Sequence, residues 1–273
     1  METIALPQNV EFKKGTEAHE GLVAVYPCYP GYGITIGNSL RRVLLSSLPG
    51  AAVVGVKIKG ADHEFMSLPH IKEDVLEIVL NLKRLRLKVF SEEPVKLELD
   101  VHGEKKVKAS DITKNAQVEI INPELQIANI TDMAGNLKME IYVAQGKGYE
   151  PVEAREKKNT EIGYIEIDSI FSPVSNVGVN LENMRVGKMT NWEKLNMAIR
   201  TDGTITPEKA FRDATKILIS QFNALINKEN KEAVKEDAEE KTEAEEETRE
   251  EAVPETAGEE KEPAKKRGRP KKS

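Results

Sequence analysis

The order of apolar and polar residues predicts a strand, a loop and a helix near the start of the chain. Leu22–Val25 is a short apolar run followed by prolines and glycines, which is typical of a strand entering a loop. Asn38 and Ser39 can then cap a helix over Leu40–Ser47, whose apolar residues recur on one face. We expect Pro49 to end that helix.

A second helix and a series of strands are predicted for the middle of the chain. The helix should span about Ile71–Leu82, with Glu73 and Asp74 in its first turn, where the helix dipole favours acids. Before and after it, apolar and polar residues alternate, which is typical of half-buried strands. The segments with this pattern are Val54–Ile58, Leu85–Val89, Val95–Val101, Lys105–Ala109, Gln117–Ile121, Met139–Ala144 and Tyr164–Asp168.

A long amphipathic helix is predicted towards the end of the apolar part of the chain. Thr206 followed by Pro207 is a typical helix start, with proline at the first helical position. The apolar residues that recur on one face are Phe211, Leu218, Phe222 and Leu225. Such a helix needs a partner surface, which is either the chain's own sheet or the same helix of a second copy.

The charges divide the chain into three parts that the overall charge of −6 conceals. Glu229–Glu262 contains 16 acidic and 5 basic residues, whereas Ala264–Ser273 contains 6 basic and no acidic ones. Beyond Asn227 there is no Leu, Ile or Phe, so this tail cannot bury a core of its own. A nearly neutral body therefore precedes a charge-segregated tail.

Composition excludes several classes of protein. No window approaches the roughly 18 apolar residues of a membrane span, and the N-terminus lacks the pattern of a secretory signal. Cys28 is the single cysteine, which excludes an internal disulfide and a cysteine-cluster zinc site. The four histidines show no close ligand spacing, so we expect no metal site and a reducing cytosol as the setting.

The glycines of Gly31–Gly37 do not match a nucleotide site. Their spacing, G-x-G-x-x-x-G, is one residue longer than that of a dinucleotide-binding turn, and the acid expected about 20 residues later is missing. We interpret the segment as a structural turn that brings backbone segments close. Phosphate-loop, G-x-S-x-G and D-x-D patterns are also missing, so we expect neither an active site nor a cofactor.

Residues 31–50, GYGITIGNSLRRVLLSSLPG, resemble the signature segment of the bacterial RNA polymerase alpha subunit, in its N-terminal assembly domain. Further segments resemble later blocks of that family and follow in the family's order. They are residues 63–65, 71–78, 80–83, 146–149, 167–174, 185–187 and 201–208. The resemblance extends over nearly all of residues 1–228, and the ordered set is more specific than any single block.

The resemblance implies an α+β fold in two subdomains. Residues 1–49 and 174–228 would form a discontinuous dimerisation subdomain, and residues 50–173 an inserted, mostly β subdomain. Two copies would form a homodimer on which the two large catalytic subunits, beta and beta-prime, assemble. The chain would then be a non-catalytic subunit of a nucleotidyltransferase complex in the bacterial cytoplasm, because nucleotide addition and its magnesium belong to the large subunits.

Residue roles also follow from the resemblance. We expect Arg42 to dock a large subunit, since a guanidinium can pair with a carboxylate through two parallel hydrogen bonds. Arg41 is its neighbour, Leu45 lies nearby, and Lys83 is a weaker candidate. The alternatives are an ordinary solvated charge for Arg42 and a cation favoured at a helix C-terminus for Lys83. The expected dimer interface, buried in either case, is Leu40, Val43, Leu44, Leu218, Phe222 and Leu225.

The tail departs from the family, whose members usually carry a compact helical C-terminal domain that binds promoter DNA and activators. We expect residues 229–263 to be an acidic, disordered linker. Residues 264–273 resemble an AT-hook, a peptide that inserts arginines into the narrow minor groove of A·T-rich DNA. The residues expected to contact DNA are Lys265, Lys266, Arg267, Gly268, Arg269, Pro270, Lys271 and Lys272.

Two alternatives accompany this interpretation of the tail. The basic end can be a generic tail that attracts polyanions without reading the groove. The whole chain can also be a stand-alone architectural DNA-binding protein, although that hypothesis gives no reason for residues 31–50 or for the long apolar helix. If the chain is instead a polymerase alpha subunit with an AT-hook, the tail would tether the polymerase to A·T-rich DNA in the nucleoid.

Overall fold

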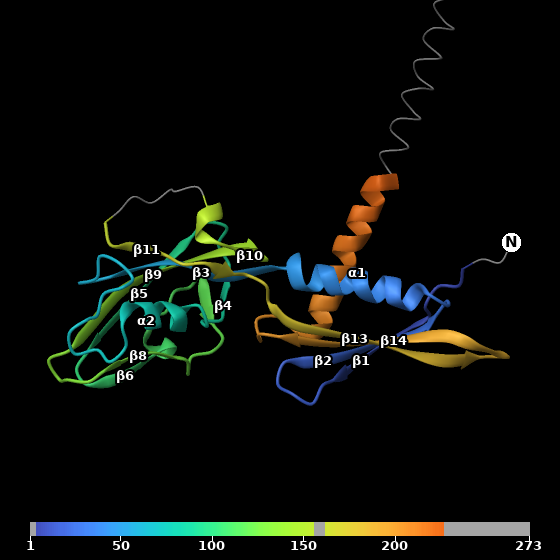
Figure 1. The fold of residues 1–273 in the computed structure, drawn as a ribbon, viewed down its shortest axis with the longest axis horizontal. Coiled ribbons are helices and arrows are strands. Elements are labelled where there is room, and N and C mark those ends of the chain that lie inside the picture. Colours follow the sequence, from blue (N-terminus) through green and yellow to red (C-terminus); the bar gives the residue numbers. More distant parts are fainter. Residues whose placement is uncertain (1–3, 156–161, 227–273) are drawn as a thin grey trace, which may run out of the picture. The chain divides into compact units, whose positions relative to one another are not determined.

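The computed structural model describes residues 4–155 and 162–226 of the chain. An antiparallel sheet of four strands is built from segments at both ends of this region, in the order β1-β2-β14-β13 (Figure 1). The strands are β1 (Asn9–Lys14), β2 (Glu20–Cys28), β13 (Val174–Val186) and β14 (Met189–Thr201). Segments more than 140 positions apart in the sequence therefore pair directly, for example Val25 with Leu195.

Two helices pack on one face of this sheet: α1 (Tyr32–Ser46) and the helix that spans residues 207–226, which contacts the core through residues 210–218. Alternate residues of each strand point to the same face, and those facing the helices are apolar. The shared core includes Val23, Val25, Leu40, Leu44, Leu195, Met197, Ile199 and Phe211. The rings of Phe12 and Phe211 meet edge to face, with centroids 5.7 Å apart.

A second set of strands and a short helix lies between β2 and β13 in the sequence. Its largest sheet has the order β11-β3-β9-β5, with β3 (Pro49–Ile58), β5 (Val95–His102), β9 (Asn136–Lys147) and β11 (Tyr164–Glu166). Shorter pairs are β4 (Leu87–Val89) with β7 (Val118–Ile120), β6 (Lys105–Lys108) with β8 (Gln126–Ile130), and β10 (Tyr149–Glu150) with β12 (Ser169–Ile170). Together with α2 (Val75–Leu82) and the short helices η1 (Ala109–Asp111) and η2 (Val152–Ala154), they confirm the predicted α+β class.

Helix α1 begins at Tyr32, well before the predicted start at Leu40. Asn38 and Ser39, the predicted caps, lie inside the helix. Gly31 occupies the N-cap position instead, with a φ of 84° that favours glycine. The prediction of a turn over Gly31–Gly37 is therefore wrong.

Packing explains why glycines are helical here. A Cβ atom on Gly33 would lie 2.7 Å from Leu181 Cδ2, and one on Gly37 would lie 2.9 Å from both Val179 Cγ1 and Leu195 Cδ1. Glycine costs a helix about 1 kcal/mol relative to alanine, and close packing on the sheet offsets that cost. The segment does bring two backbones close, as expected, but as a helix on strands β13 and β14.

Helix α2 begins at Val75, four positions later than predicted. Asp74 is its N-cap, and its carboxylate accepts a hydrogen bond from the backbone N–H of Glu77 at 2.7 Å. Glu73 precedes the helix, and its carboxylate accepts from the backbone N–H of Asn129 at 2.6 Å. Asp74 therefore acts at the helix start, as the interpretation of this pair expects, whereas Glu73 instead holds the backbone of β8, 56 positions away.

Candidate functional site

Helix α1 presents one of its two arginines directly away from the core. Its buried residues are Gly33, Gly37, Leu40 and Leu44. Successive helical residues are 100° apart, so Arg42 lies about 170° from the centre of this stripe and Arg41 about 70° from it. Both side chains are exposed, and within the described ranges neither has an ion-pair or hydrogen-bond partner. Arg42 is therefore free to bind another molecule.

Glu193 of β14 holds the N-terminal end of α1. The backbone N–H of Gly31 donates to Oε1 and that of Gly33 donates to Oε2, each at 2.9 Å. A carboxylate at this position satisfies N–H groups that the first turn of a helix leaves free, and the helix dipole favours its charge. Sequence reasoning missed this contact because the two partners are 160 positions apart and no local pattern marks Glu193.

The C-terminal end of α1 is also fixed by a contact from a distant segment. The hydroxyl of Ser172 donates to the backbone carbonyl of Leu45 at 3.0 Å. Within the helix, the hydroxyl of Ser46 donates to the backbone carbonyl of Arg42 at 2.7 Å. Leu45 is half-buried against the core of the first sheet. Because both ends of α1 are held, the position of Arg42 relative to the sheet is well defined.

Lys83 differs from Arg42 because its ammonium group is bound within the chain. Its Nζ lies 3.1 Å from Oδ2 of Asp168, whose Oδ1 accepts from the backbone N–H of Val152 at 3.0 Å. The hydrogen bond from Val152, and then the nearby Lys83, lower the pKa of Asp168 from its ordinary value of 3.8. A docking partner would have to compete with Asp168 for Lys83.

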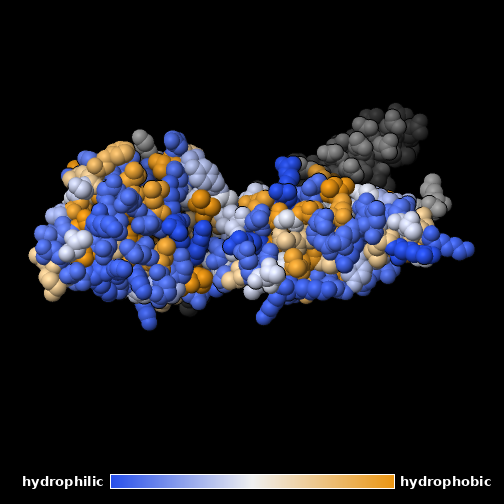
Figure 2. Space-filling model, turned by 60° about the horizontal axis from the view of Figure 1, so that its bottom comes forward, coloured by the Kyte–Doolittle hydropathy of each residue, from blue (hydrophilic) through white to orange (hydrophobic). Residues whose placement is uncertain are grey.

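The apolar stripe of the last helix leaves the core partway along. Phe211 is 8% exposed and Leu218 is half-buried against the core, whereas Phe222 and Leu225 are 58% and 64% exposed. Figure 2 shows hydrophobic residues reaching an otherwise largely hydrophilic surface. The expectation that Phe222 and Leu225 are buried is therefore wrong for a single chain. Their exposure, together with that of Ile219 and Ile226, leaves an apolar surface of about two turns.

The other residues expected at the dimer interface lie deeper in the chain. Leu40 is 4% exposed, Leu44 is fully buried and Val43 is half-buried, all against the chain's own core. Leu40 and Leu44 have almost no side-chain surface left for a second copy. The exposed end of the last helix is the more suitable contact surface.

The described residues offer little for other kinds of site. Residues 4–155 and 162–226 contain no group of three or more His, Cys, Asp or Glu side chains placed to hold a metal ion. No helix in these ranges combines the length and apolar character needed to cross a membrane. Cys28 is buried, which raises the pKa of its thiol. The predicted DNA contacts at residues 265–272 lie outside the described residues.

Comparison with known proteins identifies the family of this chain. Residues 56–172 match the family described as the RNA polymerase Rpb3/RpoA insert domain. The chain is 47% identical over 226 residues to the DNA-directed RNA polymerase subunit alpha of Oceanobacillus iheyensis, which covers 83% of this chain and 69% of that protein. It is 48% identical over 220 residues to the subunit of the same name from Symbiobacterium thermophilum, covering 81% and 68%.

A third relative agrees with the first two. The DNA-directed RNA polymerase subunit alpha of Carboxydothermus hydrogenoformans is 46% identical over 207 residues, which cover 76% of this chain and 66% of that protein. The matched region thus spans about two thirds of each relative's own length. The resemblance carried by residues 31–50 and by the later blocks is confirmed, and the chain belongs to the family of bacterial DNA-directed RNA polymerase alpha subunits.

Proposed function

We propose that two copies of this chain dimerise and that the dimer is the scaffold on which the two large catalytic subunits, beta and beta-prime, of an RNA polymerase assemble. The observation that carries the proposal is the apolar end of the last helix, whose Phe222 and Leu225 are exposed in the single chain. An exposed apolar patch on a helix that is otherwise packed marks a protein contact. The family favours this function over a stand-alone architectural DNA-binding protein.

The proposal divides the chain into two working parts. Residues 1–49 and 174–228 form the dimerisation subdomain, and residues 50–173 form the inserted subdomain. Support comes from the two separate buried cores and from the match of the insert-domain family to residues 56–172. The chain supplies no catalytic group in this proposal, and nucleotide addition takes place in the large subunits.

Arg42 is the residue that we assign to a large subunit. Its guanidinium is exposed on the side of α1 opposite the sheet, and it is free among the described residues. An arginine there can pair with a carboxylate of the partner through two hydrogen bonds. Arg41 points about 100° away on the same helix, so it serves as a matched comparison.

Replacing Arg42 with alanine should therefore weaken capture of a large subunit. We expect the apparent Kd to rise at least about tenfold for Arg42→Ala and no more than about threefold for Arg41→Ala, because an interfacial arginine in a two-hydrogen-bond pair costs about 1.4 kcal/mol or more to remove. Arg42→Lys keeps the charge but loses the planar guanidinium, so its effect on the apparent Kd should lie between those of Arg41→Ala and Arg42→Ala. The measurement is quantitative pull-down of the two large subunits by the full chain. Equal effects of Arg41→Ala and Arg42→Ala would contradict the orientation argued here.

We also propose that the basic end, residues 264–273, binds A·T-rich DNA through its minor groove, with the acidic segment 229–263 as a spacer. Support comes from Arg267-Gly268-Arg269-Pro270, in which glycine allows close approach to the groove and proline favours an extended path. The flanking lysines would contact phosphates. The tail would thus tether the polymerase to A·T-rich sequence in the nucleoid.

A charge-preserving variant separates groove binding from general attraction to DNA. Arg267→Lys combined with Arg269→Lys should reduce affinity for an A·T-rich duplex at least about tenfold at moderate salt, while affinity for a G·C-rich duplex changes little. Deleting residues 264–273 should reduce binding to both duplexes. Fluorescence anisotropy on the full chain measures each. If the double lysine variant binds both duplexes as the unmodified chain does, the tail is a generic basic segment.

A further inference from the structure

Residues 148–152 and 168–172 form a small surface element next to α1, which we call the ledge. Within it, strands β10 and β12 pair in antiparallel register, Tyr149 opposite Ile170 and Glu150 opposite Ser169. The backbone N–H of Phe171 donates to the carbonyl of Gly148 at 2.8 Å. The ledge belongs to the strand-rich part of the chain, but its contacts reach both helices that carry the candidate docking residues.

The ledge is in direct contact with the C-terminal end of α1. Besides the hydrogen bond from Ser172 to the carbonyl of Leu45, a Cβ atom on Gly148 would lie only 3.2 Å from the carbonyl oxygen of Ser46. Lys147 precedes the ledge and pairs with Pro49, at the point where the chain leaves α1. The exposed face of α1 around Arg42 and Leu45 is therefore continuous with the ledge.

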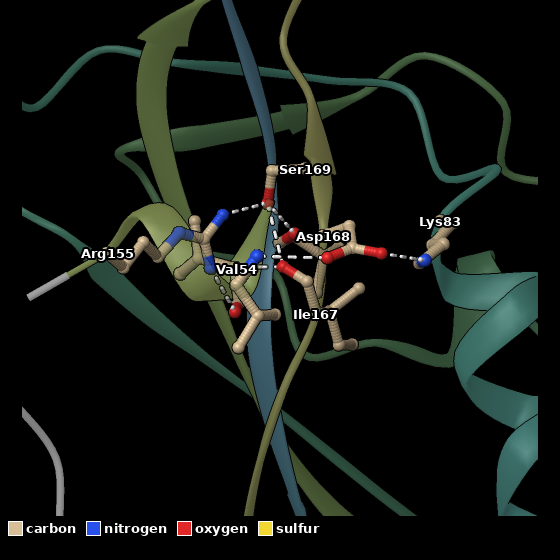
Figure 3. Close-up of polar contacts among 8 residues, drawn as sticks. Val54, Lys83, Arg155, Ile167, Asp168 and Ser169 are labelled. Atoms are coloured by element: carbon tan, nitrogen blue, oxygen red, sulfur yellow. Dashed lines mark hydrogen bonds and ion pairs between the residues drawn. The ribbon is translucent and has the colours of Figure 1, made fainter. Parts of the chain in front are cut away.

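The ledge is also bound to the end of α2. Asp168 accepts hydrogen bonds from the backbone of Val152 and from the ammonium group of Lys83, so one carboxylate joins both halves of the ledge to that helix. Figure 3 shows Lys83 and Arg155 reaching the segment Ile167–Ser169 from opposite sides. The candidate docking residues, which the sequence places on two separate helices, are thus connected through this one element.

Arg155 fixes the ledge to strand β3. Its Nη1 donates to the carbonyls of Val54 and Ile167 at 2.9 and 3.0 Å, and its Nη2 donates to the hydroxyl of Ser169 at 2.7 Å (Figure 3). Its Nε lies 3.1 Å from Oε2 of Glu150, an ion-pair distance without hydrogen-bond geometry. The guanidinium is mostly buried, with 14% of the side chain exposed. Such a network makes the ledge rigid before any partner binds.

The outer surface of the ledge is apolar and its surroundings are mainly cationic. Tyr149 is 61% exposed and its cross-strand neighbour Ile170 is 50% exposed. Lys147, like Arg42, is exposed and has no charged or hydrogen-bonding partner among the described residues. Two acids lie on the same segment: Glu150, whose side chain is 44% exposed and pairs with Arg155, and Glu153, which is exposed. Of the exposed charges without a partner that the structure describes here, Lys147 and Arg42 outnumber Glu153.

We infer that the ledge is the apolar centre of a docking surface whose cationic border includes Arg42, and that its occupant is an acidic, apolar face of one large polymerase subunit. This inference rests on the proposed function. A rigid aromatic side chain beside an aliphatic one, bordered by arginine, has the composition of an energetically dominant interface centre. The unpaired cations select an occupant with carboxylates. The continuity with α1 places that occupant where Arg42 already points.

The test uses the full chain and the two large subunits of the same polymerase. Tyr149→Ala and Ile170→Ala each remove an exposed side chain while the backbone pairing of β10 and β12 is kept, so the melting temperature should change little. We expect each variant to raise the apparent Kd for one large subunit at least about thirtyfold. Met133→Ala is the matched control, because Met133 is an apolar side chain that is 77% exposed in a turn outside the ledge. It should leave capture unchanged.

Three further results would overturn the inference. If Arg42→Ala weakens capture but both ledge variants bind normally, the proposed function stands and the ledge is not part of the interface. If the ledge variants change only the monomer–dimer equilibrium measured by light scattering, the occupant is a second copy of the chain. If the ledge variants change only the binding of duplex DNA, the occupant of this surface is a nucleic acid. Normal capture by Arg42→Ala and by the ledge variants together would instead count against docking through α1 itself.

Discussion

Phe222→Asp is expected to convert the dimer into monomers that remain folded. Phe222 is 58% exposed in the single chain, so the substitution removes no contact from its own core. In a symmetric dimer the change places a carboxylate in the interface from both copies, where it is desolvated without a partner. We expect dimer dissociation to become easier by at least about a hundredfold, or ~2.7 kcal/mol. Sedimentation or light scattering at micromolar concentration measures it.

Phe90→Asp provides the matched control for this experiment. Phe90 is also an exposed phenylalanine, at 67%, but it lies just after β4 in the strand-rich part of the chain. The same chemical change there should leave the dimer intact. A conservative change, Phe222→Leu, should retain most of the dimer because it keeps an apolar side chain. A Phe222→Asp protein that stays dimeric, with an unchanged melting temperature, would show that the helix end is not the contact.

The last helix shows which features hydrophobic periodicity can predict and which it cannot. Phe211, Leu218, Phe222 and Leu225 recur at helical spacing, so the helix and its apolar stripe could be predicted from the sequence. Periodicity does not tell where the stripe stops packing on the chain's own sheet. In the structure that point lies between the buried Phe211 and the exposed Phe222.

Helix α1 shows where local rules fail. Its first two turns contain Gly33 and Gly37, residues that local propensity assigns to a turn. They are helical because the helix packs closely on Leu181 and Leu195, residues in strands that sequence reasoning did not find. Strands β13 and β14 were missed although apolar and polar residues alternate along parts of both, as at Leu195, Met197 and Ile199 of β14.

The ledge could not be predicted at all. Arg155 is bound to the carbonyl of Val54, 101 positions earlier, and Asp168 to Lys83, 85 positions earlier. No local pattern relates such partners, and only the fold brings them together. The resemblance did point to the block containing Tyr149 and to the one containing Asp168, but it assigned neither a role. By contrast, exposed positions on a predicted helix, such as Arg42, follow directly from the helical period.

Gly50→Ala is expected to have the largest effect on stability. Gly50 lies at the start of β3, and a Cβ atom added there would lie 1.8 Å from the backbone oxygen of Phe171 and 3.0 Å from its carbonyl carbon. Backbone atoms cannot rotate away as a side-chain end can, so β3 or the ledge must shift. We expect a loss of at least about 3 kcal/mol, which corresponds to a fall in melting temperature of roughly 6–12 °C for a body of this size.

Gly178→Ala is the matched control, since Gly178 is also a strand glycine. An added Cβ there would lie 3.6 Å from the Cβ of Ala198, an ordinary van der Waals distance. Because alanine restricts the unfolded chain more than glycine does, the variant should be neutral or more stable by up to about 1 kcal/mol. Calorimetry on both proteins decides the matter. A Gly50→Ala protein that melts within about 2 °C of the unmodified chain would mean that Phe171 yields at little cost, and the ledge would then lack the rigidity that its docking role requires.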